Sequence, residues 1–423
     1  MKLFLKSVAL IFGLFFTITV FAQDQKPVPL RTIPVKKKNE DSTLYKRDST
    51  ISNKKGVKQQ DVTDVLEAWL NIQPSKKPDT VSTKPSFSVV PALGYTLVSR
   101  LAFVLSGNMA FRTAPQSRIS TIVASSAITE NKQFTFPIQS NIWSKDNTYN
   151  FVGDYRFYKY PQSTFGLGSS SNIQNNDPMD YSYFQFYETV LRHIAGNFYL
   201  GLGYIFDNHW NVSDKGNPNG TVSDYSLYGK SSNDVASGFT FNGLLDSRDN
   251  AINPSKGAYL SLQYRDNYTF LGSTNPWRSL IIDTRKYINL PEGSDNVLAL
   301  WNYEWLILSG KPAYLDLPST QWDTFSATGR GYIQGRFRGA DMVYAEAEYR
   351  YKITDNGLLG GVVFLNGESF SAAPGTRLQT IQPGFGPGLR IKLNTISKTN
   401  ISIDYGFGRQ GSNGLFIDVG EIF

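Results

Sequence analysis

The sequence predicts an all-β protein, a transmembrane antiparallel β-barrel of about 16 strands, preceded by a disordered N-terminal tail that carries one short helix. Three observations support this class. Residues 87–423 form segments of roughly 8–14 residues in which apolar and polar side chains alternate. Aromatic residues gather near the segment ends, as in "YSYFQFYE". The N-terminus resembles an export signal.

Residues 1–22 are predicted to be a signal peptide. Lys2 and Lys6 precede an apolar run, and Ala22 closes a small-residue cleavage site. The alternative is a membrane anchor, for which the run is short. The chain has no Cys, which excludes disulfides, thiolate metal sites and lipid attachment after the signal. We therefore expect export.

Residues 23–86 are predicted to be a basic, disordered periplasmic tail. They are rich in Lys, Ser, Thr, Pro and Asp, a composition that cannot bury a core. Residues 1–86 hold 15 Lys and Arg against 8 Asp and Glu, whereas the whole chain holds 42 against 35. Residues 87–423 therefore carry 27 basic and 27 acidic residues and are neutral. Their charge gives no reason to expect nucleic-acid binding by this part of the chain.

One helix, residues 61–71, is predicted within this tail. Val62, Leu66 and Trp69 belong to an apolar stripe at helical spacing, and Asp61 suits the N-cap. A helix this short is marginal in water unless it packs on something. Three interpretations follow: a transient helix, a plug inside the barrel, or a helix that docks a periplasmic partner.

Residues 87–423 are predicted to form the barrel. The segments are long for globular strands and suit strands that cross a bilayer at a tilt, which disfavours a soluble multi-sheet protein. An even strand number is usual for single-chain barrels. The final segment, "GLFIDVGEIF", alternates so that Phe423 falls on the predicted lipid face.

The stretch "GRGYIQGRFRG…AEAEYRY" combines a glycine-rich arginine loop with an alternating strand. Strand parity places Glu346 and Glu348 toward the lumen and Val343 toward lipid. An arginine loop before an acidic inner face raises the prospect of ion pairs, because guanidinium groups fit carboxylates.

This stretch and two others resemble the BamA/TamA-type superfamily of outer-membrane barrels. Its loop motif is similar to Arg330, Gly331 and Tyr332, although Gly329 stands where valine is usual. "GFGPGLRIKLNTISKTNISIDYG" resembles the penultimate hairpin. The strand–turn–strand "LLDSRDNAINPSKGAYLSLQY" matches the family at Asp246, Arg248, Asp249, Pro254 and Gly257.

The resemblance implies that Arg330 folds into the lumen and meets acids on the wall. The family's second acid is replaced here by Asn366, so Glu346 is expected to assist Glu348. Arg336 and Arg338 are expected to be solvated or to line the wall. Phe423 resembles the terminal aromatic that barrel-assembly machinery recognises. Residues 23–86 show no POTRA-like pattern, so a barrel-only member is expected.

The function expected from this resemblance is that of a non-enzymatic outer-membrane barrel of a Gram-negative bacterium. It would act in envelope biogenesis or as a subunit of an outer-membrane complex, in contact with outer-membrane lipid and with partner proteins through residues 23–80. The alternatives are a porin-like channel and an outer-membrane enzyme. Only two His are present, with His209 expected in a loop, and cation binding at Asp246 and Asp249 is less favoured than a turn role. We expect no cofactor and no metal.

Overall fold

The computed structural model describes residues 57–69, 71, 83–395 and 397–423, which all belong to one compact unit, Arg47–Phe423. The predicted signal peptide and most of the tail lie outside these residues. The first half of the chain forms α2 (Val62–Trp69), β1 (Ser86–Thr96), β2 (Arg100–Arg112), β3 (Ile119–Thr129), β4 (Phe134–Trp143), β5 (Tyr149–Lys159), β6 (Gln162–Thr164), β7 (Asp177–Ala195) and β8 (Phe198–Asp214).

The second half continues with strands of similar length. They are α3 (Asp224–Tyr228), β9 (Asn233–Asp246), β10 (Gly257–Asn267), β11 (Trp277–Asn289), β12 (Val297–Gly310), β13 (Asp341–Lys352), β14 (Leu359–Phe370), β15 (Gln382–Lys392), β16 (Asn400–Phe407) and β17 (Asn413–Val419). Over the described residues, no helix is long and apolar enough to cross a membrane.

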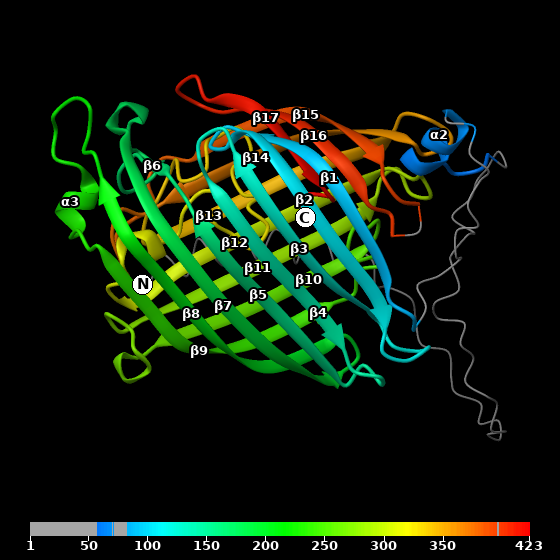
Figure 1. The fold of residues 1–423 in the computed structure, drawn as a ribbon, viewed down its shortest axis with the longest axis horizontal. Coiled ribbons are helices and arrows are strands. Elements are labelled where there is room, and N and C mark those ends of the chain that lie inside the picture. The colour runs from blue at the N-terminus through cyan, green and yellow to red at the C-terminus, as the bar shows by residue number, and fades with distance from the viewer. Residues whose placement is uncertain (1–56, 70, 72–82, 396) are drawn as a thin grey trace, which may run out of the picture. The chain divides into compact units, whose positions relative to one another are not determined.

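The strands form an up-and-down antiparallel barrel (Figure 1). Each strand pairs with the next along the chain, except that β5 and β6 both pair with β7. The three-residue β6 thus extends the line of β5 and leaves sixteen positions around the wall. β1 and β17 lie side by side, but no ladder joins them in the part of the chain that the structure describes. The barrel is nearly closed, which confirms the predicted fold class.

Strand alternation separates the two faces of the wall. On β13, Tyr344, Glu346, Glu348 and Arg350 are buried, whereas Tyr351 on the other parity is 37% exposed. Outward-facing Leu365 on β14 is 60% exposed, as expected for a side chain that meets lipid. The parity predicted for this region is therefore confirmed.

The connections differ between the two ends of the barrel. The two longest, 215–232 and 311–340, lie at one end, which we call the long-loop end. The opposite, short-turn end includes the turns 353–358 and 393–399. Outer-membrane barrels place short turns in the periplasm and longer loops outside the cell. The short-turn end therefore corresponds to the end that faces the periplasm in barrels of that class.

Helix α2 contacts this short-turn end. Asp61 caps the helix, since its Oδ1 accepts from the main-chain N–H groups of Thr63 (3.1 Å) and Asp64 (3.2 Å). Its Oδ2 accepts from the N–H of Thr395 (3.0 Å), and the N–H of Gln60 donates to the carbonyl of Asn356 (3.0 Å). Within the described residues, α2 is thus fastened to two turns and does not plug the lumen. It is slightly shorter than the predicted 61–71.

Candidate functional site

The loop between β12 and β13 folds into the lumen. Its residues Arg330, Tyr332 and Phe337 are at most 2% exposed. Gly329 (φ 72°) and Gly331 (φ 111°) adopt left-handed conformations, so the chain can reverse there without a Cβ clash. This reversal points the side chain of Arg330, which lies between them, at the inner wall.

Arg330 is the centre of the site. Its Nη1 donates to Asp404 Oδ2 (2.6 Å), and its Nη2 donates to Glu348 Oε2 (2.5 Å) and also to Glu346. The guanidinium lies 3.7 Å from the ring centroid of Phe364, a cation–π geometry. One arginine therefore joins the lumen loop to β13 and β16.

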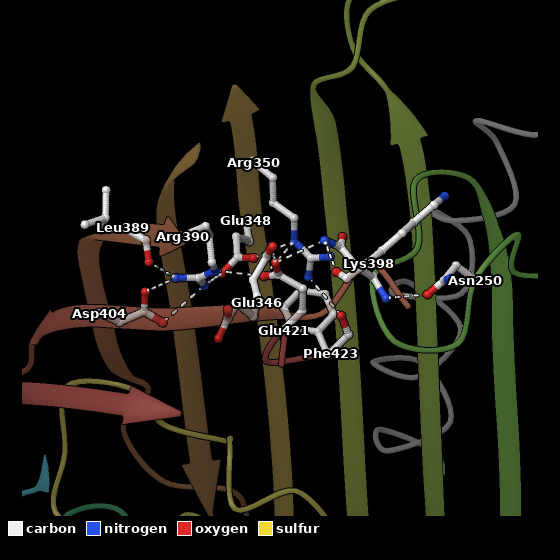
Figure 2. Close-up of polar contacts among 12 residues, drawn as sticks. Asn250, Glu346, Glu348, Arg350, Leu389, Arg390, Lys398, Asp404, Glu421 and Phe423 are labelled. Atoms are coloured by element: carbon white, nitrogen blue, oxygen red, sulfur yellow. Dashed lines mark hydrogen bonds and ion pairs between the residues drawn. The ribbon is translucent and has the colours of Figure 1, made fainter. Parts of the chain in front are cut away.

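The pairs around Arg330 extend into a larger charged cluster. Figure 2 shows its part formed by Glu348, Arg350, Arg390, Asp404 and Glu421. Arg350 Nε donates to Glu348 Oε1 (2.7 Å), and Arg390 Nη1 donates to Asp404 Oδ1 (2.5 Å). Arg390 Nε also donates to Glu421 Oε2 (2.8 Å). Three guanidinium groups thus meet four carboxylates, and each buried charge has an opposite neighbour, as burial requires.

Sequence reasoning missed Asp404 as the further acid of this cluster. Asn366 does reach the loop, but its Nδ2 donates to the main-chain carbonyl of Arg330 (3.1 Å) and not to a charge. The alternation in "NISIDYGFG" already placed Asp404 on the inner parity. The register that brings β16 opposite the loop could not be read from one strand alone.

Glycines of the wall make room for the loop. A Cβ at Gly406 would lie 2.6 Å from the main-chain N of Gly331, and one at Gly408 would lie 2.7 Å from the ring of Tyr332. A Cβ at Gly384 would lie 2.4 Å from the carbonyl oxygen of Arg330. Real side chains do not tolerate such approaches, so this glycine recess (Gly384, Gly406 and Gly408) is a condition of the docked loop.

The prediction for Arg336 and Arg338 is wrong. Both were expected in a solvated loop or along the wall, yet they are 1% and 2% exposed. Arg336 Nη2 donates to the carbonyl of Ser171 (2.8 Å) and to Gln410 Oε1 (2.9 Å). Arg338 Nη1 donates to the carbonyl of Tyr314 (3.0 Å). The guanidinium groups are buried because main-chain carbonyls of the loops replace water.

The strand–turn motif lies at the short-turn end. Arg248 Nε donates to Asp246 Oδ1 (2.9 Å), and Asp249 Oδ1 accepts from the N–H of Ser255 (2.8 Å). Burial opposes the charge of Arg248, but Asp246 outweighs it and raises the pKa of Arg248 above its usual value. Pro254 is buried and Gly257 has φ 107°. The acids of "DSRDN" therefore organise the turn.

Asn253, in the same turn, touches the charged cluster. Its Nδ2 lies 3.3 Å from Glu421 Oε1, so the motif and the cluster are linked at the short-turn end.

The prediction that Phe423 lies on the lipid face is also wrong. It is 4% exposed and does not face lipid. Gly420 (φ 130°) turns the chain after β17, and the Phe423 ring stacks on Trp301 with 5.1 Å between centroids. Arg350 Nη2 donates to the main-chain oxygen of Phe423 (2.8 Å). Simple strand alternation fails here because the strand ends at Val419.

The predicted docking helix exposes part of its apolar stripe. Trp69 is 79% exposed and Val65 is 43% exposed, while Val62 is half-buried and Leu66 lies between them in the helix. His209, expected in a loop, lies in β8 instead. It is 4% exposed and stacks on Tyr183 (4.4 Å between centroids). In the described residues, no group of three or more His, Asp or Glu is arranged to hold a metal.

Comparisons with known proteins find similar barrels among solved structures. No family model and no curated protein sequence matches the chain. BamA from Haemophilus ducreyi lacking POTRA domains 1-3 superposes with a TM-score of 0.50 and 14% identity, over 80% of this chain and 69% of that one. CdiB from Escherichia coli gives 0.53 and 10%, over 82% of this chain and 63% of that one. The chain therefore spans less than two thirds of CdiB. The barrel fold implied by the resemblance is confirmed.

Proposed function

From the barrel fold that this chain shares with BamA and CdiB, we propose that it is a non-enzymatic outer-membrane protein of envelope biogenesis. It assists the insertion or translocation of proteins, or it serves as a subunit of an outer-membrane complex. The observation that carries the proposal is the lumen loop, which Arg330 fastens to Glu346, Glu348 and Asp404.

The clamped loop argues against the porin-like alternative. A sixteen-strand barrel is wide enough for an aqueous channel. Here residues 311–340 occupy the lumen, and Arg336 and Arg338 bind neighbouring loop carbonyls instead of lining a water path. A lumen filled by a loop suits a barrel that acts through contacts with other proteins and not through passage of solutes.

Helix α2 is the proposed contact with periplasmic proteins. It is held at the short-turn end through Asp61, and it presents Trp69 at the surface. Exposed tryptophans are frequent energetic centres of protein interfaces. The partner is therefore a periplasmic or outer-membrane protein with an apolar groove for a short helix.

A pull-down from outer membranes tests the partner contact. We expect the full chain to retain a specific protein that is lost on deletion of residues 23–80 and reduced at least about tenfold by Trp69→Ala, because a hot-spot tryptophan contributes about 2 kcal/mol or more. Phe270→Ala is the matched control, since Phe270 is 75% exposed at the opposite end. Unchanged co-purification after the deletion would remove α2 from the proposal.

Two further measurements test the function itself. Cells that lack the chain should show lowered amounts of folded outer-membrane barrels or of a surface-exported protein, restored by the wild type and not by Arg330→Ala. In planar bilayers the wild type should show no large steady conductance. A large open pore, together with normal envelope proteins in the deletion strain, would favour the porin-like function.

A further inference from the structure

We propose that the long-loop end binds a divalent cation, best matched by Ca²⁺, in a small cavity beside Asp177. This site is separate from the charged cluster around Arg330 and does not depend on the proposed function.

The cavity lies between the hairpin of β6 and β7 and the loop that precedes and begins α3. Its volume is about 40 Å³, more than the space of one water molecule. The lining residues are Thr164, Gly166, Asn175, Asp177, Asn217, Thr221, Val222, Ser223 and Asp224. It is therefore a polar chamber shared by two loops.

Asp177 is the observation that points to a ligand. Its side chain is 0% exposed, and no hydrogen-bond donor reaches either of its carboxylate oxygens in the described part of the chain. A buried carboxylate without a partner costs several kcal/mol, so a compensating group is required. The cavity beside it is the place where such a group fits.

A second acceptor in the cavity lacks a donor. Asn217 Nδ2 donates to Thr221 Oγ1 (3.0 Å), but its buried Oδ1 has no donor among the described residues. Two acceptors that face one polar cavity without donors favour a cation over a hydrogen-bonding solute.

The lining of the cavity is acidic. Its described lining includes the carboxylates of Asp177 and Asp224 and no basic residue. The nearby Lys230 is engaged elsewhere, since its Nζ lies 2.6 Å from Asp214 Oδ2. Asp224 Oδ2 accepts from the N–H of Leu167 (2.6 Å), which fixes this carboxylate against the hairpin. A bound dication would neutralise the pair.

Oxygen donors of this kind select a hard cation. Two carboxylates, an amide oxygen and water make up the mixed oxygen set that Ca²⁺ accepts, whereas Mg²⁺ demands stricter octahedral geometry and keeps more water. With so few acidic ligands, we expect a dissociation constant of about 10⁻⁴–10⁻³ M, typical of extracellular calcium sites.

The cation would stabilise loops that touch the lumen loop. The N–H of Gly168 donates to the carbonyl of Arg338 (2.7 Å), and Ser171 binds Arg336. Cation binding at Asp177 would therefore hold the outer mouth of the barrel, next to the clamped loop.

Calorimetry on the full chain in detergent, stripped with EGTA, tests the site. CaCl₂ and MgCl₂ are titrated separately into wild type, Asp177→Asn, Asn217→Ala and the control Glu292→Gln, whose side chain is exposed at the short-turn end. We expect one Ca²⁺ per chain, weaker Mg²⁺ binding, at least a tenfold loss of affinity in Asp177→Asn, a smaller loss in Asn217→Ala and no change in the control.

Thermal unfolding gives a second measurement. Ca²⁺ should raise the midpoint of the wild type and not that of Asp177→Asn, which should be at least as stable as the wild type in EGTA because its orphan charge is gone. Heat-modifiable migration on gels verifies that each variant is folded. No binding by the wild type at 10 mM of either cation, or equal binding by Asp177→Asn, would overturn the proposal.

Discussion

Arg330 and Asp404 meet inside the barrel with 2.6 Å between Nη1 and Oδ2, although 74 positions separate them along the chain. Arg330 lies on the loop that precedes β13, and Asp404 lies on β16, next to the strand that borders β1. The contact joins the lumen loop to the last hairpin of the wall. A substitution at either residue should therefore affect both the loop and the hairpin.

Replacing Arg330 with alanine should release the loop. The change leaves Glu346, Glu348 and Asp404 close together with one fewer cation, at a cost of about 3–5 kcal/mol. Denaturant unfolding should report that loss, and proteolysis should reveal new cleavage at Arg336 or Arg338. Arg330→Lys should recover only part of the stability, because an ammonium lacks the planar fork. A loop that stays protected in Arg330→Ala would show that other contacts hold it.

The two glutamates of β13 should differ in importance. Glu348 contacts Arg330, Arg350 and Arg390, whereas among these arginines Glu346 pairs only with Arg330 in the described contacts. Glu348→Gln should therefore destabilise the barrel by about 3 kcal/mol and Glu346→Gln by clearly less. Unfolding midpoints of the two isosteric variants provide the measurement. The opposite order would contradict the role assigned to Glu348.

Gly406→Ala should displace the loop without removing any charge. The new Cβ would lie 2.6 Å from the main-chain N of Gly331, so overpacking should cost about 1–3 kcal/mol. Gly107→Ala on β2 is the control, since its Cβ would meet its nearest neighbour at an ordinary 3.8 Å. Hydrogen exchange of residues 329–335 should increase in the first variant only. Equal exchange in both would mean that the glycine recess is not needed.

Phe423→Ala should loosen the short-turn end of the lumen. The buried ring stacks on Trp301, and its loss should cost about 3 kcal/mol and shift tryptophan fluorescence. Val419→Ala, at a 49% exposed position of β17, should have a much smaller effect. If the two variants unfold alike, the inward packing of Phe423 contributes nothing to stability. An assembly-signal role would instead appear as slower insertion with unchanged final stability.

Asp61→Ala should free helix α2 from the barrel. The change removes an N-cap, at a cost of about 1 kcal/mol, and the hydrogen bond from the N–H of Thr395. Trypsin should then cut faster at Lys58, while the barrel resists as before. Thr395→Ala keeps its main-chain N–H and should have a weaker effect. Equal cleavage of wild type and Asp61→Ala would contradict the anchoring role.

The fold was predictable because each strand carries its own alternation. Parity alone placed Glu346 and Glu348 on the inner face, and it holds wherever a strand is regular. It fails at Phe423, where Gly420 ends the strand and the next residues obey loop geometry.

The partners of the site were less predictable for a physical reason. Pairing between a loop and a distant strand depends on register and on how deeply the loop enters, and neither has a local signal. Arg336 and Arg338 show the same limit: their sequence context looks solvated, but carbonyls from residues such as Ser171 and Tyr314 surround them. Asp404 was visible as an inward acid yet not as the partner of Arg330.

The glycine recess fixes the position along the wall at which the loop docks. Consecutive loop residues 330, 331 and 332 meet residues 404 and 406 of β16 and residue 408 just beyond its end, so one step of the loop matches two residues of this segment. A single inserted residue before position 404 would turn the carboxylate toward lipid and bring side chains where the loop needs bare backbone. Docking of the loop therefore depends on the register of β16, and a barrel with a shifted register would not bind its own lumen loop.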